Sequence, residues 1–128
     1  PGLHGASAAI EFGVLGLDVR HIVVLGHARC GGIKAALSGA QIAGGGFVDA
    51  WMKIIDSARS RVLLDYPDDP QAALERAAIE VSLTNLRTFP YIAAREAAGS
   101  LKLHGALFGI ERGDLLVLDQ KSGNFEPA

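Results

Sequence analysis

The sequence contains a single cysteine, Cys30, so the chain cannot form an internal disulfide. Proteins without disulfides are typical of reducing compartments, and we therefore expect a cytoplasmic protein. The first residues show no basic segment followed by an apolar stretch, so the sequence predicts no export signal. Cys30 is then either an apolar filler in a core or a functional thiol.

Long apolar runs and an excess of positive charge are also missing. The longest apolar runs have about five residues, whereas a membrane-spanning helix needs roughly 20. The net charge is −2 and the isoelectric point is about 6.1, which leaves no basic stripe of the kind that binds nucleic acid. We therefore expect neither a membrane nor a nucleic acid as a partner.

What is present is a globular composition, with 49% hydrophobic and 20% charged residues. Its 128 residues suit one domain, and alternating helical and strand-like patterns predict an α/β fold. The predicted helices are residues 7–17, 31–37, 47–64, 70–87 and 91–98, and the predicted strands are residues 21–25, 101–110 and 115–119. The glycines at 44–46 predict a flexible break inside the domain.

Residues 47–64 show the clearest amphipathic pattern. Apolar side chains recur there at helical spacing, namely Val48, Trp51, Met52, Ile55, Ala58 and Val62. Among the carboxylates, Glu11 and Glu80 are the better candidates for buried roles. Three strands are few for five helices to cover, so either strands escape this pattern or the chain is incomplete.

His27 and Cys30 follow the predicted strand over residues 21–25, where α/β sheets bind ligands. Imidazole nitrogen and thiolate sulfur are zinc ligands. Cys30 also starts the predicted helix over residues 31–37, whose N-terminus favours the thiolate. Gly31 and Gly32 carry no Cβ, so a small anion could approach their N–H groups.

A lone His-x-x-Cys pair is weak evidence, because such pairs arise by chance and a lone cysteine is more often simply buried. Zinc also needs at least three protein ligands, so another must come from elsewhere. His4, His21 and His104 fit better as surface or hydrogen-bonded histidines than as ligands.

Longer stretches carry a resemblance. The segments 7–12 (Ser-Ala-Ala-Ile-Glu-Phe) and 21–33, which includes His-Ala-Arg-Cys-Gly-Gly, resemble the helix, strand and metal-binding turn of β-class carbonic anhydrases. Residues 81–90 resemble the long helix of that family, and residues 103–119 its closing hairpin. The resemblance implies one partial domain over residues 1–128, with a mostly parallel sheet flanked by helices and without the first two strands of the family.

The resemblance also implies a zinc site. The family binds Zn²⁺ through a cysteine, a histidine and a second cysteine, and the last two match His27 and Cys30. The first cysteine belongs to a Cys-x-Asp-x-Arg motif that has no counterpart here, so no catalytic Asp–Arg pair is assigned. Gly31 and Gly32 are expected to contact the substrate.

The implied activity is the zinc-dependent, reversible hydration of CO2 to bicarbonate, by a lyase that forms a homodimer or a higher homo-oligomer. We expect the 128-residue chain alone to bind zinc weakly and to hydrate CO2 slowly or not at all. Hydrolysis of CS2 or COS and a non-catalytic dimerisation remnant are the alternatives. A nucleotide-binding domain is weaker, because no phosphate-binding glycine motif follows a strand.

Overall fold

The structure, a computed structural model, describes residues 4–39 and 46–128. It is an α/β fold with one four-stranded mixed sheet in the order β1-β2-β3-β4, which confirms the predicted fold class. The elements are α1 (Gly5–Glu11), the π-helical turn η1 (Phe12–Gly16), β1 (His21–His27), α2 (Gly31–Ser38), α3 (Phe47–Met52), the 3₁₀ turn η2 (Lys53–Ile55), α4 (Asp56–Asp65), α5 (Pro70–Leu86), α6 (Pro90–Ala97), β2 (Lys102–Gly109), β3 (Asp114–Asp119) and β4 (Asn124–Pro127). Within the described residues, no helix has the length and apolar character needed to cross a membrane.

The sheet has one parallel and two antiparallel pairings. β1 and β2 run parallel, with His21 opposite Lys102 and His27 opposite Phe108. β2, β3 and β4 then pair antiparallel. The three predicted strands are confirmed, and β4 is the strand that the sequence pattern missed. It escaped because its four residues include a proline and only one large apolar side chain, that of Phe125.

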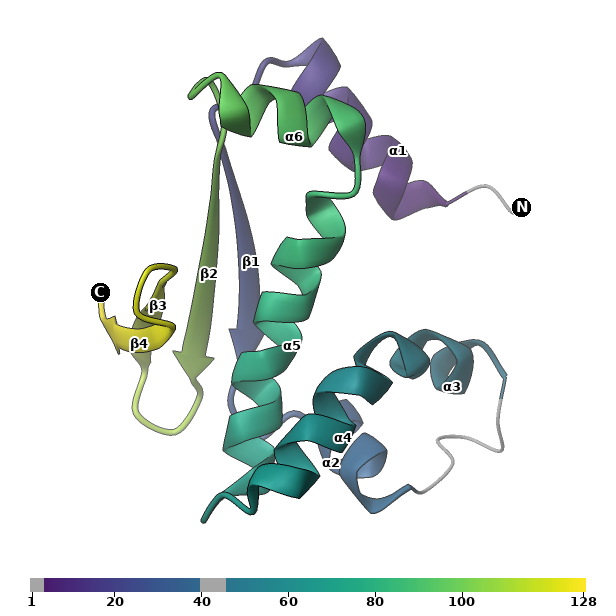
Figure 1. The fold of residues 1–128 in the computed structure, drawn as a ribbon, viewed down its shortest axis with the longest axis vertical. Helices are drawn as coiled ribbons and strands as arrows, with labels where there is room; N and C mark the ends of the chain where they lie inside the picture. The colour runs from purple at the N-terminus through teal and green to yellow at the C-terminus, as the bar shows by residue number, and fades with distance from the viewer. Residues whose placement is uncertain (1–3, 40–45) are drawn as a thin grey trace.

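Helix α5 crosses one face of the sheet and connects the two ends of the molecule (Figure 1). It begins as predicted, because the Asp69 carboxylate accepts a hydrogen bond from the Ala72 N–H at 3.0 Å and Pro70 occupies the first turn. Its predicted apolar face is buried. That face is Ile79, Leu83 and Leu86, which pack with side chains of β1, β2 and β3.

Two glycines allow α5 to approach the sheet closely. A Cβ added to Gly26 of β1 would lie 2.9 Å from Cδ1 of Ile79. One added to Gly105 of β2 would lie 2.8 Å from Cγ2 of Ile79 and 3.2 Å from Cβ of Leu118. Ile79 therefore packs against both β1 and β2, and a larger residue at Gly26 or Gly105 would crowd its side chain.

The helix predicted over residues 47–64 is interrupted. The 3₁₀ turn η2 separates α3 from α4, and its tighter winding rotates α3 out of the expected register. Ile55, Ala58 and Val62 are buried as predicted, but Trp51 is 68% exposed and Val48 is 44% exposed, so the prediction was wrong for that end. The predicted glycine break is described only at Gly46, since residues 44 and 45 lie outside the described part of the chain.

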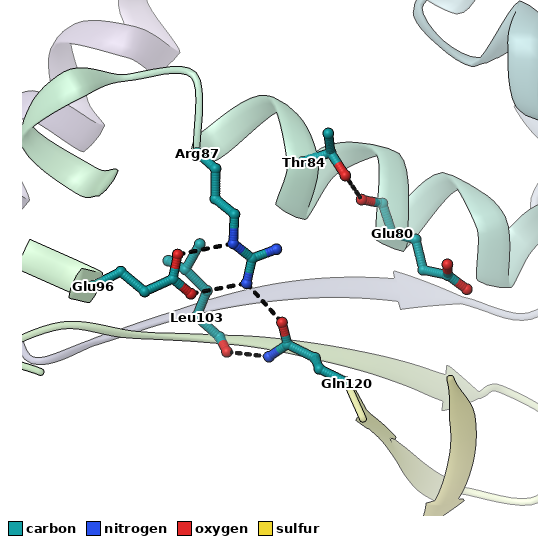
Figure 2. Close-up of polar contacts among 6 residues, drawn as sticks. All are labelled: Glu80, Thr84, Arg87, Glu96, Leu103 and Gln120. Atoms are coloured by element: carbon teal, nitrogen blue, oxygen red, sulfur yellow. Dashed lines mark hydrogen bonds and ion pairs between the residues drawn. The ribbon is translucent and has the colours of Figure 1, made fainter. Parts of the chain in front are cut away.

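A polar network holds the end of α5 (Figure 2). The Arg87 guanidinium donates two hydrogen bonds of 2.8 Å to the Glu96 carboxylate of α6 and one of 2.7 Å to the Gln120 side chain. The Gln120 amide in turn donates to the Leu103 carbonyl at 2.7 Å. These hydrogen bonds connect the corner between α5 and α6 to β2 and to the turn after β3.

Large apolar side chains are exposed on the sheet and near the N-terminus of the described chain. The sheet face opposite α5 exposes five large side chains, which we call the open sheet face: Val23, Leu25, Phe108, Leu115 and Val117. Helix α1 has no buried residue, and Phe12 and Leu15 of the following turn are 63% and 50% exposed. Apolar surface of this extent is typical of a contact between protein chains.

Candidate metal centre

The candidate centre is the turn that joins β1 to α2, at the carboxyl end of β1. The Ala28 N–H donates to the Phe108 carbonyl at 2.9 Å, which extends the β1–β2 pairing one residue beyond His27. Arg29 then adopts a left-handed conformation (φ 57°), and Cys30 is the N-cap of α2. His27 and Cys30 therefore stand at the two ends of one short turn that the sheet holds in place.

The hydrogen bond of His27 determines which ring nitrogen is available. Nδ1 lies 3.1 Å from the Ala28 carbonyl oxygen, which can only accept, so Nδ1 carries the proton. The lone pair of the neutral ring is then on Nε2. Metal-binding histidines commonly have this arrangement, in which the second nitrogen donates to a carbonyl and fixes the tautomer.

Cys30 is half-buried and packs against the cluster that includes Ile33 of α2 and Met52 of α3. Its Sγ would lie 3.7 Å from a Cβ added to Gly32, so the thiol is directed toward the first turn of α2. Gly31 is exposed, and a Cβ added to it would meet no described heavy atom within 4 Å. The role of Gly31 and Gly32 in substrate binding stays a prediction.

A buried carboxylate that the sequence analysis missed lies behind the turn. Glu75 of α5 is only 5% exposed, and its Oε1 accepts the Cys30 N–H at 2.9 Å. Glu11 and Glu80, which were expected to be better candidates for burial, are both exposed. The signal was present in the sequence, because Glu75 lies one turn before Ile79 on the apolar face of α5.

The turn also contacts the β2–β3 hairpin. Nε of Arg29 lies 2.9 Å from the Glu111 carboxylate, in an ion pair whose side chains are 73% and 66% exposed. A cavity of about 180 Å³ lies between this hairpin and the start of α5. Its walls include Ala28, Arg29 and Glu75. The exposed Arg29–Glu111 ion pair contributes little to the free energy of folding, so its only assigned role is to place the loop.

The other histidines do not join the turn. Nδ1 of His21 and Nε2 of His104 are 3.0 Å apart, at the end of β1 opposite to His27. His4 is exposed before α1. Over residues 4–39 and 46–128, no group of three or more His, Cys, Asp or Glu residues is placed to hold a metal ion. The assignment of His27 and Cys30 as zinc ligands therefore stays a prediction, and a site built on them would need a further ligand from elsewhere.

Comparison with known proteins identifies the class. The sequence model of the carbonic anhydrase family matches residues 2–115, so the chain belongs to this family. Its relatives of known structure place it in the β class. Carbonic anhydrase 1 of Escherichia coli O157:H7 is 33% identical over 127 residues, which make up 96% of this chain and 58% of that protein.

Solved structures agree in fold. The β-carbonic anhydrase CcaA superposes with a TM-score of 0.89 at 31% identity, over 99% of this chain and 59% of that one. A structure from the study of two tetrameric β-carbonic anhydrases of Sordaria macrospora gives 0.79 at 32% identity, over 89% and 59%. The chain thus spans a little under three fifths of the length of these relatives.

Proposed function

We propose that this chain carries part of a zinc site and serves the reversible hydration of CO2 to bicarbonate. The observation that supports it best is the turn between β1 and α2, where a half-buried thiol lies three residues after a histidine whose Nδ1 carries the ring proton. A third protein ligand, from outside the described residues, would complete the catalytic set.

The donor atoms suit zinc better than other divalent cations. Mg²⁺ and Ca²⁺ prefer oxygen ligands, whereas imidazole nitrogen and thiolate sulfur together are typical of zinc. The hydrogen bond to the Ala28 carbonyl fixes the His27 ring and increases the basicity of Nε2. Cys30 is the N-cap of α2 and therefore lies at the positive end of that helix.

Each part of the turn then has a chemical role. Zinc, when bound, would lower the pKa of a coordinated water so that hydration of CO2 proceeds near neutral pH. The N–H groups of Gly31 and Gly32, at the start of α2, would hold an oxygen of the bicarbonate. No catalytic residue is proposed from this chain, because the Asp–Arg pair of the family has no match in it.

Zinc titration in competition with a chromogenic chelator tests the ligands. We expect the chain to bind zinc weakly, and binding to be lost in His27→Gln and Cys30→Ser. His104→Gln, which removes a histidine outside the turn, is the matched control. Equal zinc binding by Cys30→Ser and the unaltered chain would refute the site.

Stopped-flow hydration of CO2 with a pH indicator tests the activity. We expect slow or undetectable turnover by the 128-residue chain, because two ligands do not retain zinc well. Rapid turnover by this chain would contradict the need for a third ligand. Hydrolysis of CS2 or COS is measured in the same samples, and a zinc content near zero would favour the non-catalytic dimerisation remnant.

We further propose that the chain forms a homodimer or a higher homo-oligomer in the cytoplasm. The open sheet face and the exposed apolar side chains of Phe12 and Leu15 support self-association. A tetrameric relative at 32% identity supports it as well. The lone cysteine supports a reducing compartment.

A further inference from the structure

We infer that Gln71 and Glu75 of α5 are positioning residues for Cys30, because together they hold the N–H and the carbonyl of that residue. This inference rests on the proposed function only for its consequence, which is the placement of a zinc ligand. The contacts themselves are independent of any metal.

Glu75 holds the N–H side of Cys30. Its Oε1 lies 2.9 Å from the Cys30 nitrogen and 3.1 Å from Nε2 of Gln71. As the N-cap, Cys30 precedes the first turn of α2, so its N–H has no partner within that helix. The hydrogen bond therefore satisfies a backbone donor and a nearly inaccessible carboxylate together, both of which would be costly to bury alone.

Gln71 holds the carbonyl side. Its Nε2 lies 3.3 Å from the Cys30 oxygen, which also accepts the Lys34 N–H at 3.0 Å. Gln71 and Glu75 are one helical turn apart and therefore share one face of α5. Both ends of the Cys30 residue are thus fixed to a single helix.

Helix α5 in turn relates the two proposed ligands to each other. Ile79, one turn after Glu75, packs against Gly26, which immediately precedes His27 in β1. The same helix therefore carries the side chains that hold Cys30 and the side chain that contacts the end of β1. A ligand that is already held in place loses less entropy when it binds a metal. Gln71 and Glu75 should therefore raise the metal affinity of the site without contacting the metal.

Because Cys30 is the only cysteine, the reaction of the metal-free chain with an aromatic disulfide reports on this turn alone. We expect Glu75→Leu and Gln71→Leu to speed the reaction about fivefold, the change that corresponds to one lost hydrogen bond. Glu75→Gln keeps an acceptor oxygen and should restore a rate near that of the unaltered chain. Glu80→Leu removes an exposed carboxylate of the same helix and is the matched control.

Cobalt binding tests the consequence. In the unaltered chain we expect a thiolate-to-cobalt charge-transfer band on addition of Co²⁺. Glu75→Leu should shift that band and weaken binding about fivefold, whereas Glu75→Gln should preserve both. Loss of affinity without a shift of the band would show a structural role only, and would overturn the inference.

The outcomes separate this inference from the proposed function. Absence of Co²⁺ and Zn²⁺ binding by the unaltered chain would refute the proposed function. The rates of reaction with the aromatic disulfide would still test whether Gln71 and Glu75 hold Cys30. Equal rates for Glu75→Leu and Glu80→Leu would overturn the inference. If circular dichroism shows Glu75→Leu to be unfolded, Gln71→Leu decides: an accelerated rate supports the inference and an unchanged one overturns it.

Discussion

At the scale of single residues, Tyr91 carries a group that the fold does not satisfy. Its hydroxyl is buried without a hydrogen-bond partner among the described residues, while its ring packs against Phe89 at 5.5 Å between centroids. An unpaired buried hydroxyl costs about 1 kcal/mol or more. We therefore expect Tyr91→Phe to raise the free energy of unfolding by about 1 kcal/mol, measured by urea denaturation.

The matched change at Tyr66, whose side chain is 87% exposed, should leave the stability unchanged. A Tyr91→Phe variant that is less stable than the unaltered chain would show that the hydroxyl does have a partner in solution.

At Gly105 we expect a substitution to lower the stability instead, because this position has room only for a glycine. An added methyl group would lie 2.8 Å from Cγ2 of Ile79, a β-branched side chain whose χ1 is restricted in a helix. We expect Gly105→Ala to destabilise the chain by about 1–3 kcal/mol. Gly13→Ala, where an added Cβ meets no described heavy atom within 4 Å, is the control. Equal unfolding midpoints for the two variants would contradict the tight contact.

At the scale of elements, the contact between α5 and α6 depends on pH. The hydrogen bonds from Arg87 hold the pKa of the Glu96 carboxyl below its usual value of 4.5, against the opposing effect of burial. Because the folded pKa is lowered, the stabilisation is present above about pH 4.5 and is lost as the pH falls through the folded value. Acid should therefore loosen this corner.

Glu96→Gln tests this contact. The two side chains are 38% and 29% exposed, so solvent screens the pair. We expect a loss of about 0.5–1 kcal/mol at neutral pH, shrinking as the pH falls below about 4.5. Urea denaturation across this pH range measures it, with Glu80→Gln as the control. A difference that stays constant with pH would show that charge has no part in it.

At the scale of the whole molecule, the open sheet face predicts an assembly. Leu25 is 64% exposed and Val23 is 57% exposed, in a row that ends at His27. We expect the chain to sediment as a dimer or a larger species. Leu25→Arg should shift it toward the monomer by placing a charge in the contact.

Leu64→Arg, on α4 and 74% exposed, is the matched control and should leave the sedimentation coefficient unchanged. If the unaltered chain sediments as a monomer at all concentrations, self-association through the open sheet face is refuted.

The sequence by itself determined the local elements. Alternating patterns placed β1, α5 and the β2–β3 hairpin. These features depend on residues that are near neighbours in the chain, so their patterns are readable without the fold. The His-x-x-Cys spacing marked the candidate turn for the same reason.

Only the tertiary structure decided which groups meet across long distances. The contact of Glu75 with the Cys30 N–H joins residues 45 positions apart, and the sequence analysis favoured Glu11 and Glu80 instead. The turn η2 changed the register of α3, and β4 formed from a segment with one large apolar residue because β3 offered it an edge. Packing between distant segments selects among local possibilities. The sequence therefore indicated the turn after β1 as a candidate site, but not the residues of α5 that hold it.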